Sequence, residues 1–483
     1  MGKTPKIITL LAALAAVGIG GGMLGAHFLS QHRASNDTDQ VRESSAQPDL
    51  TDPRLIQQGA YIARTADCAA CHTTPGGAPY AGGLAMQTPL GAIYSTNITP
   101  DLNTGIGHYS LADFTRAVKH GVRADNQPLY PAMPYPSYAI MPDEDIAALY
   151  AFFMHEVDAV NQANGESTIP WPLNMRWPMS WWQLLFAPER EFVANEQLTP
   201  EENHGAYLIE GPGHCGACHT PRGLAYQEKA MNLAKLEKSD FLSGAVIDGW
   251  RAKSLRSEAR GLDSWSKEEL ALFFKTGRTD KVAAFGAMAD VIEHSTRYMT
   301  DADINAMAAY LKQLPPAKNK ILAFEPKEDT TTALLQAGVN LDKGATVYVE
   351  NCQVCHRADG LGMPRVFPAL AGNSAIFAKN PQSVIQITLE GGKTPSNDVD
   401  VMDFAMPSFN HLSNQELVAV INFIRNGWQN QAPEISANQI DHIRKFLLNK
   451  APNLVFNTVS NPGSHSVTSP GASASASTRG VDE

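Results

Sequence analysis

The stretch CAACH at residues 68–72 recurs as CGACH at 215–219 and as CQVCH at 352–356, and this repeat decides the fold. Together the three stretches use all six cysteines of the 483-residue chain. C-x-x-C-H is the attachment pattern of c-type haem, whose porphyrin is bound by both thiols and whose iron is bound by the histidine. The predicted covalent ligands are Cys68, Cys71, Cys215, Cys218, Cys352 and Cys355, and the predicted iron ligands are His72, His219 and His356.

Other uses of paired cysteines fit this pattern less well. A zinc site needs about four ligands, whereas these pairs lie more than a hundred residues apart. A thioredoxin-like redox pair needs a βαβ context, which the sequence does not show. Plain disulfide bonds would not require a histidine directly after each pair. We therefore expect three haem c cofactors, one for each motif.

Three further pieces of sequence recur around each motif: a helix containing Gly-Ala, a helix that ends at glycine, and a closing helix with one apolar face. A glycine inside a helix costs about 1 kcal/mol, so its recurrence predicts close contact with the closing helix, whose aromatic residue (Phe152, Tyr310 or Phe423) would pack against it. The Gly-Ala pairs stand at 59–60, 205–206 and 344–345, the terminal glycines are Gly121, Gly277 and Gly391, and the closing helices are expected at 143–153, 301–311 and 414–424.

These repeats predict an all-α chain of three tandem cytochrome c-like domains, each folded around one covalent haem. A domain of about 100 residues has a marginal core by itself, so the haem is expected to complete that core. The expected ranges are 50–160 (module 1), 197–318 (module 2) and 338–430 (module 3), joined by a Trp-rich linker at 161–196 and followed by a helix at 431–459 and a disordered Ser/Ala tail at 460–483.

Two of these segments allow two interpretations each. The linker at 161–196 holds four of the seven tryptophans. They could pack between modules or contact a partner subunit or quinone, since aromatic clusters favour interfaces. The helix within 431–459 is amphipathic, so it could lie on a membrane surface or pack on the protein.

A methionine is expected opposite each histidine, because a His/Met pair gives an iron a higher reduction potential than two histidines do. One Ala-Met pair precedes each closing helix, and its methionines are Met133, Met288 and Met406. Proline follows the first and the third, where it would stiffen the loop, but Ala289 follows Met288. With both axial positions filled, no open site for substrate is expected at the irons, and no catalytic centre is predicted on this chain.

Other methionines are weaker candidates for the iron. Met141 and Met299 share a register with Leu412, which cannot bind iron. Met307 faces into a closing helix and is interpreted as core. Met402 remains an alternative for the third module.

The N-terminus predicts export from the cytoplasm. Lys3 and Lys6 precede an apolar run from Ile7 to Leu29, and such an arrangement keeps the N-terminus cytoplasmic while the rest crosses the membrane. The segment 1–34 is either a retained anchor or a signal cleaved near Ala26 or Ala34. Either reading places the chain on the periplasmic side of a bacterial inner membrane, the compartment in which c-type haems are attached. The net charge of −11 gives no indication of a nucleic-acid partner.

Several longer stretches resemble the trihaem cytochrome c subunits of membrane-bound dehydrogenases. They are YSTNITPD at 94–101, TGIGHYSLADFTRAVKHGV at 104–122, LYPAMPY at 129–135 and WPLNMRWPMSWWQLLF at 171–186. The family serves quinoprotein alcohol and aldehyde dehydrogenases and flavin-dependent gluconate, sorbitol and fructose dehydrogenases. The resemblance implies a large partner subunit that uses pyrroloquinoline quinone, flavin or molybdopterin, with or without a small subunit. It also implies that electrons pass through this chain to membrane ubiquinone.

Two other functions remain open at this point. The chain could be a haem enzyme, such as a peroxidase or a sulfur-compound dehydrogenase, which would need an open or replaceable iron ligand. It could also be a cytochrome module of a respiratory oxidase. Low-spin spectra and co-purification with a large dehydrogenase subunit would favour the electron carrier over both.

Overall fold

The computed structural model describes only part of the chain. No described helix is long and apolar enough to cross a membrane. The predicted signal or anchor at 1–34 and the predicted tail at 460–483 lie outside the described residues, apart from Gly25. The described residues are 25 and 48–450 without 89, 234–239, 248, 259–260, 318–328, 398 and 401.

The first helix and the closing helix of each module pack against one another, as the repeats predict. Their recurring glycines are the points of contact, because a Cβ added there would strike the backbone of the closing helix. It would lie 1.9 Å from the Ala148 oxygen at Gly59, 2.0 Å from the Ala306 oxygen at Gly205 and 2.6 Å from the Ala419 oxygen at Gly344. The helix pairs are α2 (Pro53–Thr65) with α6 (Asp143–His155), α8 (Pro200–Glu210) with α12 (Asp301–Gln313), and α14 (Lys343–Asn351) with α17 (Asn414–Asn426).

The predicted aromatic contact is confirmed in modules 1 and 3. The Cβ atoms of Phe152 and Phe423 are among the nearest neighbours of the glycines there. In module 2 the nearest atoms belong to the backbone of Ala306 and Met307 instead of Tyr310.

The middle helices also end where predicted. They are α4 (Leu111–His120), α10 (Lys267–Thr276) and α16 (Gln382–Glu390). The glycine after each has a positive φ, namely 67° at Gly121, 73° at Gly277 and 75° at Gly391. Glycine adopts this backbone conformation without strain, so it stops the helix.

The described residues are mostly helical, but they also form three two-stranded ribbons, which depart from the all-α prediction. They are antiparallel and belong to the loops between the haem motif and the closing helix. The strands are β1 (Ala85–Thr88) with β2 (Gly91–Tyr94), β3 (Ala245–Ile247) with β4 (Trp250–Ala252), and β5 (Gly392–Lys393) with β6 (Ala405–Met406). Each pairing is only two to four residues long, too short to give a period-2 sequence pattern.

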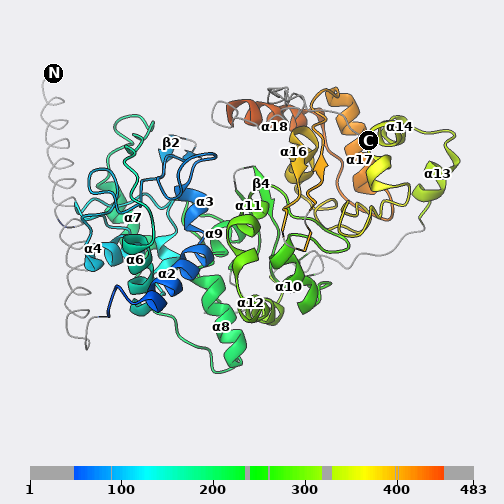
Figure 1. Cartoon of the computed structure of the whole chain (residues 1–483). Helices are drawn as coiled ribbons and strands as arrows, with labels where there is room; N and C mark the ends of the chain where they lie inside the picture. The colour runs from blue at the N-terminus through cyan, green and yellow to red at the C-terminus, as the bar shows by residue number, and fades with distance from the viewer. Residues whose placement is uncertain are drawn as a thin grey trace, which may run out of the picture.

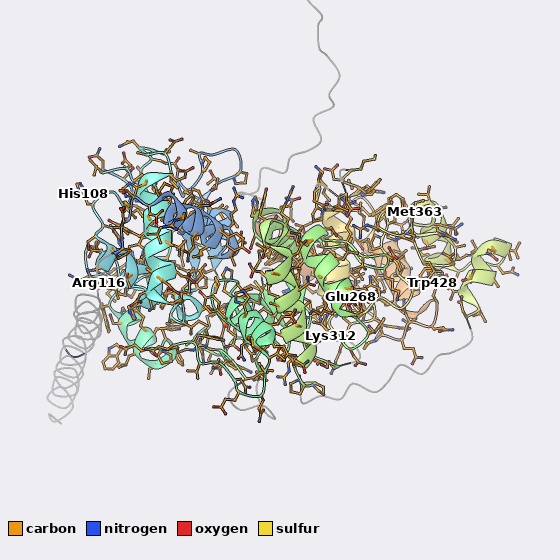
Figure 2. All side chains as sticks on the ribbon, turned by 60° about the horizontal axis from the view of Figure 1, so that its bottom comes forward. His108, Arg116, Glu268, Lys312, Met363 and Trp428 are labelled. Carbon is orange, nitrogen blue, oxygen red and sulfur yellow. The ribbon has the colours of Figure 1, made fainter. Side chains whose placement is uncertain are left out.

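Each predicted module has one large hydrophobic cluster among the described residues. Module 2 also holds a small second cluster of Ala284, Ala289 and Ile292. The modules follow one another across Figure 1, with module 2 in the middle. Trp428, labelled in Figure 2, is a buried residue of module 3. Its ring lies against that of Tyr348, with centroids 5.2 Å apart, and its indole donates to the Ala358 oxygen at 2.8 Å. Each module therefore has its own core.

The C-terminal helix packs on the protein through its apolar face. This helix, α18 (Ala437–Lys450), places Ile440 and Ile443 in the core of module 3. Arg444 also donates to the Leu412 oxygen at 2.6 Å. These contacts favour the packed interpretation over a helix lying on a membrane by that face.

The tryptophan-rich linker joins modules 1 and 2. Its helix α7 (Pro178–Phe186) donates from Gln183 to the Gly121 oxygen of module 1 at 2.8 Å. From the same helix, the indole of Trp182 donates to the Ala225 oxygen of module 2 at 2.7 Å. Packing between modules is thus observed, while Trp171, at 78% exposure, remains on the surface.

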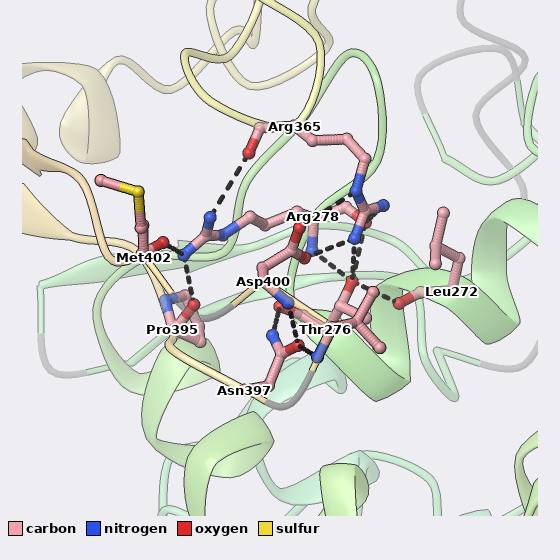
Figure 3. Close-up of polar contacts among 9 residues, drawn as sticks. Leu272, Thr276, Arg278, Arg365, Pro395, Asn397, Asp400 and Met402 are labelled. Carbon is pink, nitrogen blue, oxygen red and sulfur yellow. Dashed lines mark hydrogen bonds and ion pairs between the residues drawn. The ribbon is translucent and has the colours of Figure 1, made fainter.

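Two arginines join modules 2 and 3 (Figure 3). Arg278 of module 2 is only 2% exposed, and it donates to the oxygens of Pro395 at 2.5 Å, Met402 at 2.8 Å and Arg365 at 3.4 Å. Arg365 of module 3 donates back to the Arg278 oxygen at 3.2 Å and forms an ion pair with Asp400. This reciprocal contact places the loop after α10 against module 3.

Candidate haem-attachment sites

Each C-x-x-C-H motif forms a short helix that ends on its histidine. The three helices are α3 (Cys68–His72), α9 (Gly216–His219) and α15 (Gln353–His356). The first cysteine of each pair, at positions 68, 215 and 352, has a free thiol. Burial raises the pKa of each of these three thiols to about 12. They are therefore neutral groups in apolar surroundings, as suits a site that also takes a porphyrin.

The three histidines are held in the same way. In each, the ring atom Nδ1 lies within hydrogen-bond distance of a backbone oxygen, which leaves Nε2 to bind a metal. Burial lowers the pKa of His72 and His356, and that of His219 to about 4, so the rings are neutral at neutral pH. The distances are 2.6 Å from His72 to the Thr96 oxygen, 2.7 Å from His219 to the Lys253 oxygen and 3.0 Å from His356 to the Pro368 oxygen.

A glycine of positive φ supports each histidine from its backbone side. Its amide donates to the histidine's own carbonyl oxygen. The bonds run from Gly82 (φ 73°) to His72 at 2.7 Å, from Gly244 (φ 90°) to His219 at 2.7 Å, and from Gly362 (φ 64°) to His356 at 3.2 Å.

The same glycines lie against the segment that supplies the Nδ1 acceptor. A Cβ on Gly82 would lie 2.4 Å from the carbonyl carbon of Thr96, and one on Gly362 would lie 2.8 Å from the Pro368 oxygen. At Gly244 the corresponding distance to the carbonyl carbon of Lys253 is 3.2 Å. We call the glycine and the acceptor segment together the histidine cradle.

Sequence reasoning missed the histidine cradle. The glycines stand ten, 25 and six residues after their histidines, so no common spacing marks them. In modules 1 and 2 the ribbons bring the acceptor segment to the histidine, because β2 ends two residues before Thr96 and β4 ends one residue before Lys253. The only sequence signal was YSTNITPD, which contains Thr96.

The three predicted axial methionines occupy different local structures. Met133 and Met288 are half-buried and pack against the cores of modules 1 and 2. Met406 is half-buried in β6, where it pairs with Gly392. Met288 is the second residue of a helix, α11 (Ala287–His294). The amide of Ala289 donates to the Gly286 oxygen at 2.8 Å, a bond that the proline of the other two modules could not make.

The rival methionines differ from these in exposure. Met141, Met299 and Met307 are 1–2% exposed and belong to the hydrophobic cores. Met402 is 68% exposed on the surface of module 3. The half-buried methionines of the Ala-Met pairs are therefore the better candidates for a ligand that reaches into a haem site.

The residues present fit haem c. Each site combines two thiols and a neutral imidazole on one short helix and, in modules 2 and 3, the residue that caps its N-terminus. The imidazole is oriented by a backbone oxygen, and an apolar core lies beside it.

Comparison with known proteins agrees with this geometry. The family model described as Cytochrome c matches residues 56–156 and 341–428. Over 404 residues the chain is 46% identical to the cytochrome c subunit of alcohol dehydrogenase (quinone) from Gluconacetobacter polyoxogenes, covering 83% of this chain and 86% of the relative.

Relatives that serve other substrates also align over most of their length. The gluconate 2-dehydrogenase cytochrome c subunit of Pantoea cypripedii is 47% identical over 82% of this chain and 91% of its own. The fructose dehydrogenase cytochrome subunit of Gluconobacter japonicus is 33% identical over 80% of this chain and 82% of its own. This chain therefore belongs to the family of cytochrome c subunits of alcohol, gluconate and fructose dehydrogenases.

Proposed function

We propose that this chain carries three haem c groups and passes electrons from a dehydrogenase large subunit to ubiquinone in the membrane. The observation that carries the proposal is the threefold recurrence of a C-x-x-C-H helix whose histidine Nδ1 lies against a backbone oxygen. Relatives in alcohol, gluconate and fructose dehydrogenases support a dehydrogenase partner. The word quinone in the name of the alcohol dehydrogenase supports the acceptor.

Module boundaries at 50–160, 197–318 and 338–430 belong to the same proposal. One large hydrophobic cluster in each range supports them, and the third cluster also takes in Leu335 before its range and Ile440 and Ile443 of α18 after it. The periplasmic side of the inner membrane is the proposed location, with the partner's cofactor being pyrroloquinoline quinone, flavin or molybdopterin. These assignments rest on the sequence and on the family.

The chain's own residues would hold each haem from both sides. Cys68 and Cys71, with their counterparts, would attach it, and the histidines would bind iron through Nε2. Met133, Met288 and Met406 are the proposed opposite ligands. A haem so ligated supplies one-electron chemistry at its iron.

The histidine cradle would tune that chemistry. An Nδ1–H that donates to a backbone oxygen fixes the ring orientation and makes Nε2 a stronger donor. The apolar cores would exclude water from the irons. Both effects belong to an electron carrier, which needs stable ligation in both oxidation states.

The proposal is tested by counting haems and following electrons. The mature chain purified from the periplasmic fraction should exceed its polypeptide mass by three haems, and a variant with Cys352→Ala and Cys355→Ala by two. The wild-type complex should reduce a ubiquinone analogue when given the partner's substrate. A chain without haem, or a complex whose haems stay oxidised with substrate present, would contradict the proposal.

A further inference from the structure

Modules 1 and 2 meet through a reciprocal pair of contacts. Tyr61 on α2 donates its hydroxyl to Asp303 on α12. Tyr207 on α8 donates its hydroxyl to Asp145 on α6 at 2.5 Å. The two tyrosines stand two residues after the helix-contact glycine of their module, and both aspartates are the third residue of a closing helix. The modules are therefore related by an approximate two-fold axis.

The centre of this interface lies beside both haem motifs. The Tyr138 hydroxyl of module 1 donates to the Ala66 oxygen at 2.8 Å, two residues before Cys68. The Tyr138 ring also meets the ring of His214 of module 2 edge-on, with centroids 5.7 Å apart. His214 is the residue directly before Cys215.

A second contact ties the same point to module 2. The Ser295 hydroxyl, just after α11, donates to the Thr65 oxygen at 3.2 Å. Thr65, Ala66 and Ser295 are at most 3% exposed, and Tyr138 is 6% exposed. The segment that precedes the first haem motif is thus buried between Tyr138 and the end of α11 in module 2, and the half-buried His214 lies beside it.

Resting on the proposed function, we propose that Tyr138 and His214 are positioning residues that hold the first two haem-attachment sites together for direct electron exchange. Cys68 and Cys215 anchor covalently bound groups on either side of this contact. The hydrogen bond from Tyr138 to the Ala66 oxygen and the ring contact of Tyr138 with His214 form a short path through protein. The Tyr–Asp pairs at the periphery would supply binding energy, while Tyr138 and His214 would set the separation at the centre.

The test follows a single electron through the full-length chain carrying its haems. A light flash with a soluble flavin photoreductant delivers substoichiometric electrons, and absorbance records their redistribution as phases independent of protein concentration. The phase due to exchange between haems 1 and 2 is identified with the variant Met133→His. This change lowers the reduction potential of haem 1, so haem 1 no longer accepts the electron and the phase is lost. This phase should be slowed in Tyr138→Phe, which removes one oxygen, and lost in His214→Leu.

The matched control is Tyr207→Phe, which removes one hydroxyl from the periphery of the same interface. It should leave the rate of the phase unchanged, and all variants should keep near-wild-type midpoint potentials for haem 3. An unchanged phase in both central variants would overturn the inference. Equal slowing in the central variants and in the control would also overturn it, since every contact of the interface would then contribute only to binding the two modules together.

Failure of this inference can be told apart from failure of the proposed function. If only the inference is wrong, substrate still reduces all haems and the quinone analogue, and the phase is insensitive to Tyr138 and His214. If the proposed function is wrong, wild-type haems do not accept electrons from the dehydrogenase. Tyr138→Phe keeps the ring and its packing, so the test remains informative if His214→Leu does not fold.

Discussion

Replacing Gly59 by alanine should destabilise module 1 although alanine is the better helix former. Alanine favours the helix by about 1 kcal/mol. The new Cβ, however, would lie 1.9 Å from the Ala148 oxygen, and this neighbour is backbone that cannot rotate away. Overpacking costs about 1–3 kcal/mol, and a rigid backbone neighbour favours the upper end. The net effect should be a loss of about 2 kcal/mol.

The assay is urea unfolding of the full-length chain with its haems, followed by the absorbance change when axial ligands are lost. With a slope of about 1–3 kcal/mol per molar urea, the midpoint of one transition should fall by about 1 M. Gln57→Ala changes an exposed residue of the same helix and should shift stability by less than about 0.5 kcal/mol.

A graded comparison makes this prediction sharper. Gly344→Ala should cost less than Gly59→Ala, because its Cβ would lie 2.6 Å from the nearest backbone oxygen. A midpoint for Gly59→Ala at or above the wild-type value would refute the argument that the glycine permits close helix contact. A Gln57→Ala loss as large as that of Gly59→Ala would refute it too.

Three further predictions concern the interface, the pH dependence and the iron ligands. Arg278→Leu leaves one buried carbonyl oxygen, that of Pro395, and two part-buried ones without their donor. It should cost roughly 3 kcal/mol, seen in calorimetry as earlier, separate unfolding of module 3. Burial raises the pKa of Glu210 and of Glu228 to about 7. The folded state therefore holds these protons more tightly than the unfolded state does. The free energy of unfolding should be highest below about pH 4.5 and should fall by on the order of 3 kcal/mol per group between there and about pH 7. Glu210→Gln should remove about half of that slope in urea midpoints measured against pH. Met133→Leu should lower the potential of haem 1 and make its iron high-spin, whereas Met141→Leu should leave the spectrum unchanged. A high-spin iron in Met141→Leu with an unchanged spectrum in Met133→Leu would instead make Met141 the ligand of haem 1.

The glycines show which structural roles can be predicted from the sequence and which are seen only in the tertiary structure. Gly59 allows close packing of two helices, and Gly121 ends a helix. Both roles could be predicted, because the same glycines recur at equivalent positions in all three repeats. Gly82 acts only in three dimensions, because its partners are the backbone of His72 and the segment at Thr96. Its use could not be inferred from spacing.

The covalent haem attachment and the helices could be predicted from the sequence alone. The C-x-x-C-H motifs, the helices of each repeat and the glycines that let those helices touch were predicted from it, because each depends on residues close in the chain or repeated three times. The tertiary structure alone decided which backbone oxygens orient the histidines, that Met288 stands on a helix, and how Tyr138 meets His214. These contacts join segments far apart in the chain, and no periodic pattern records which distant backbone a fold brings beside a side chain.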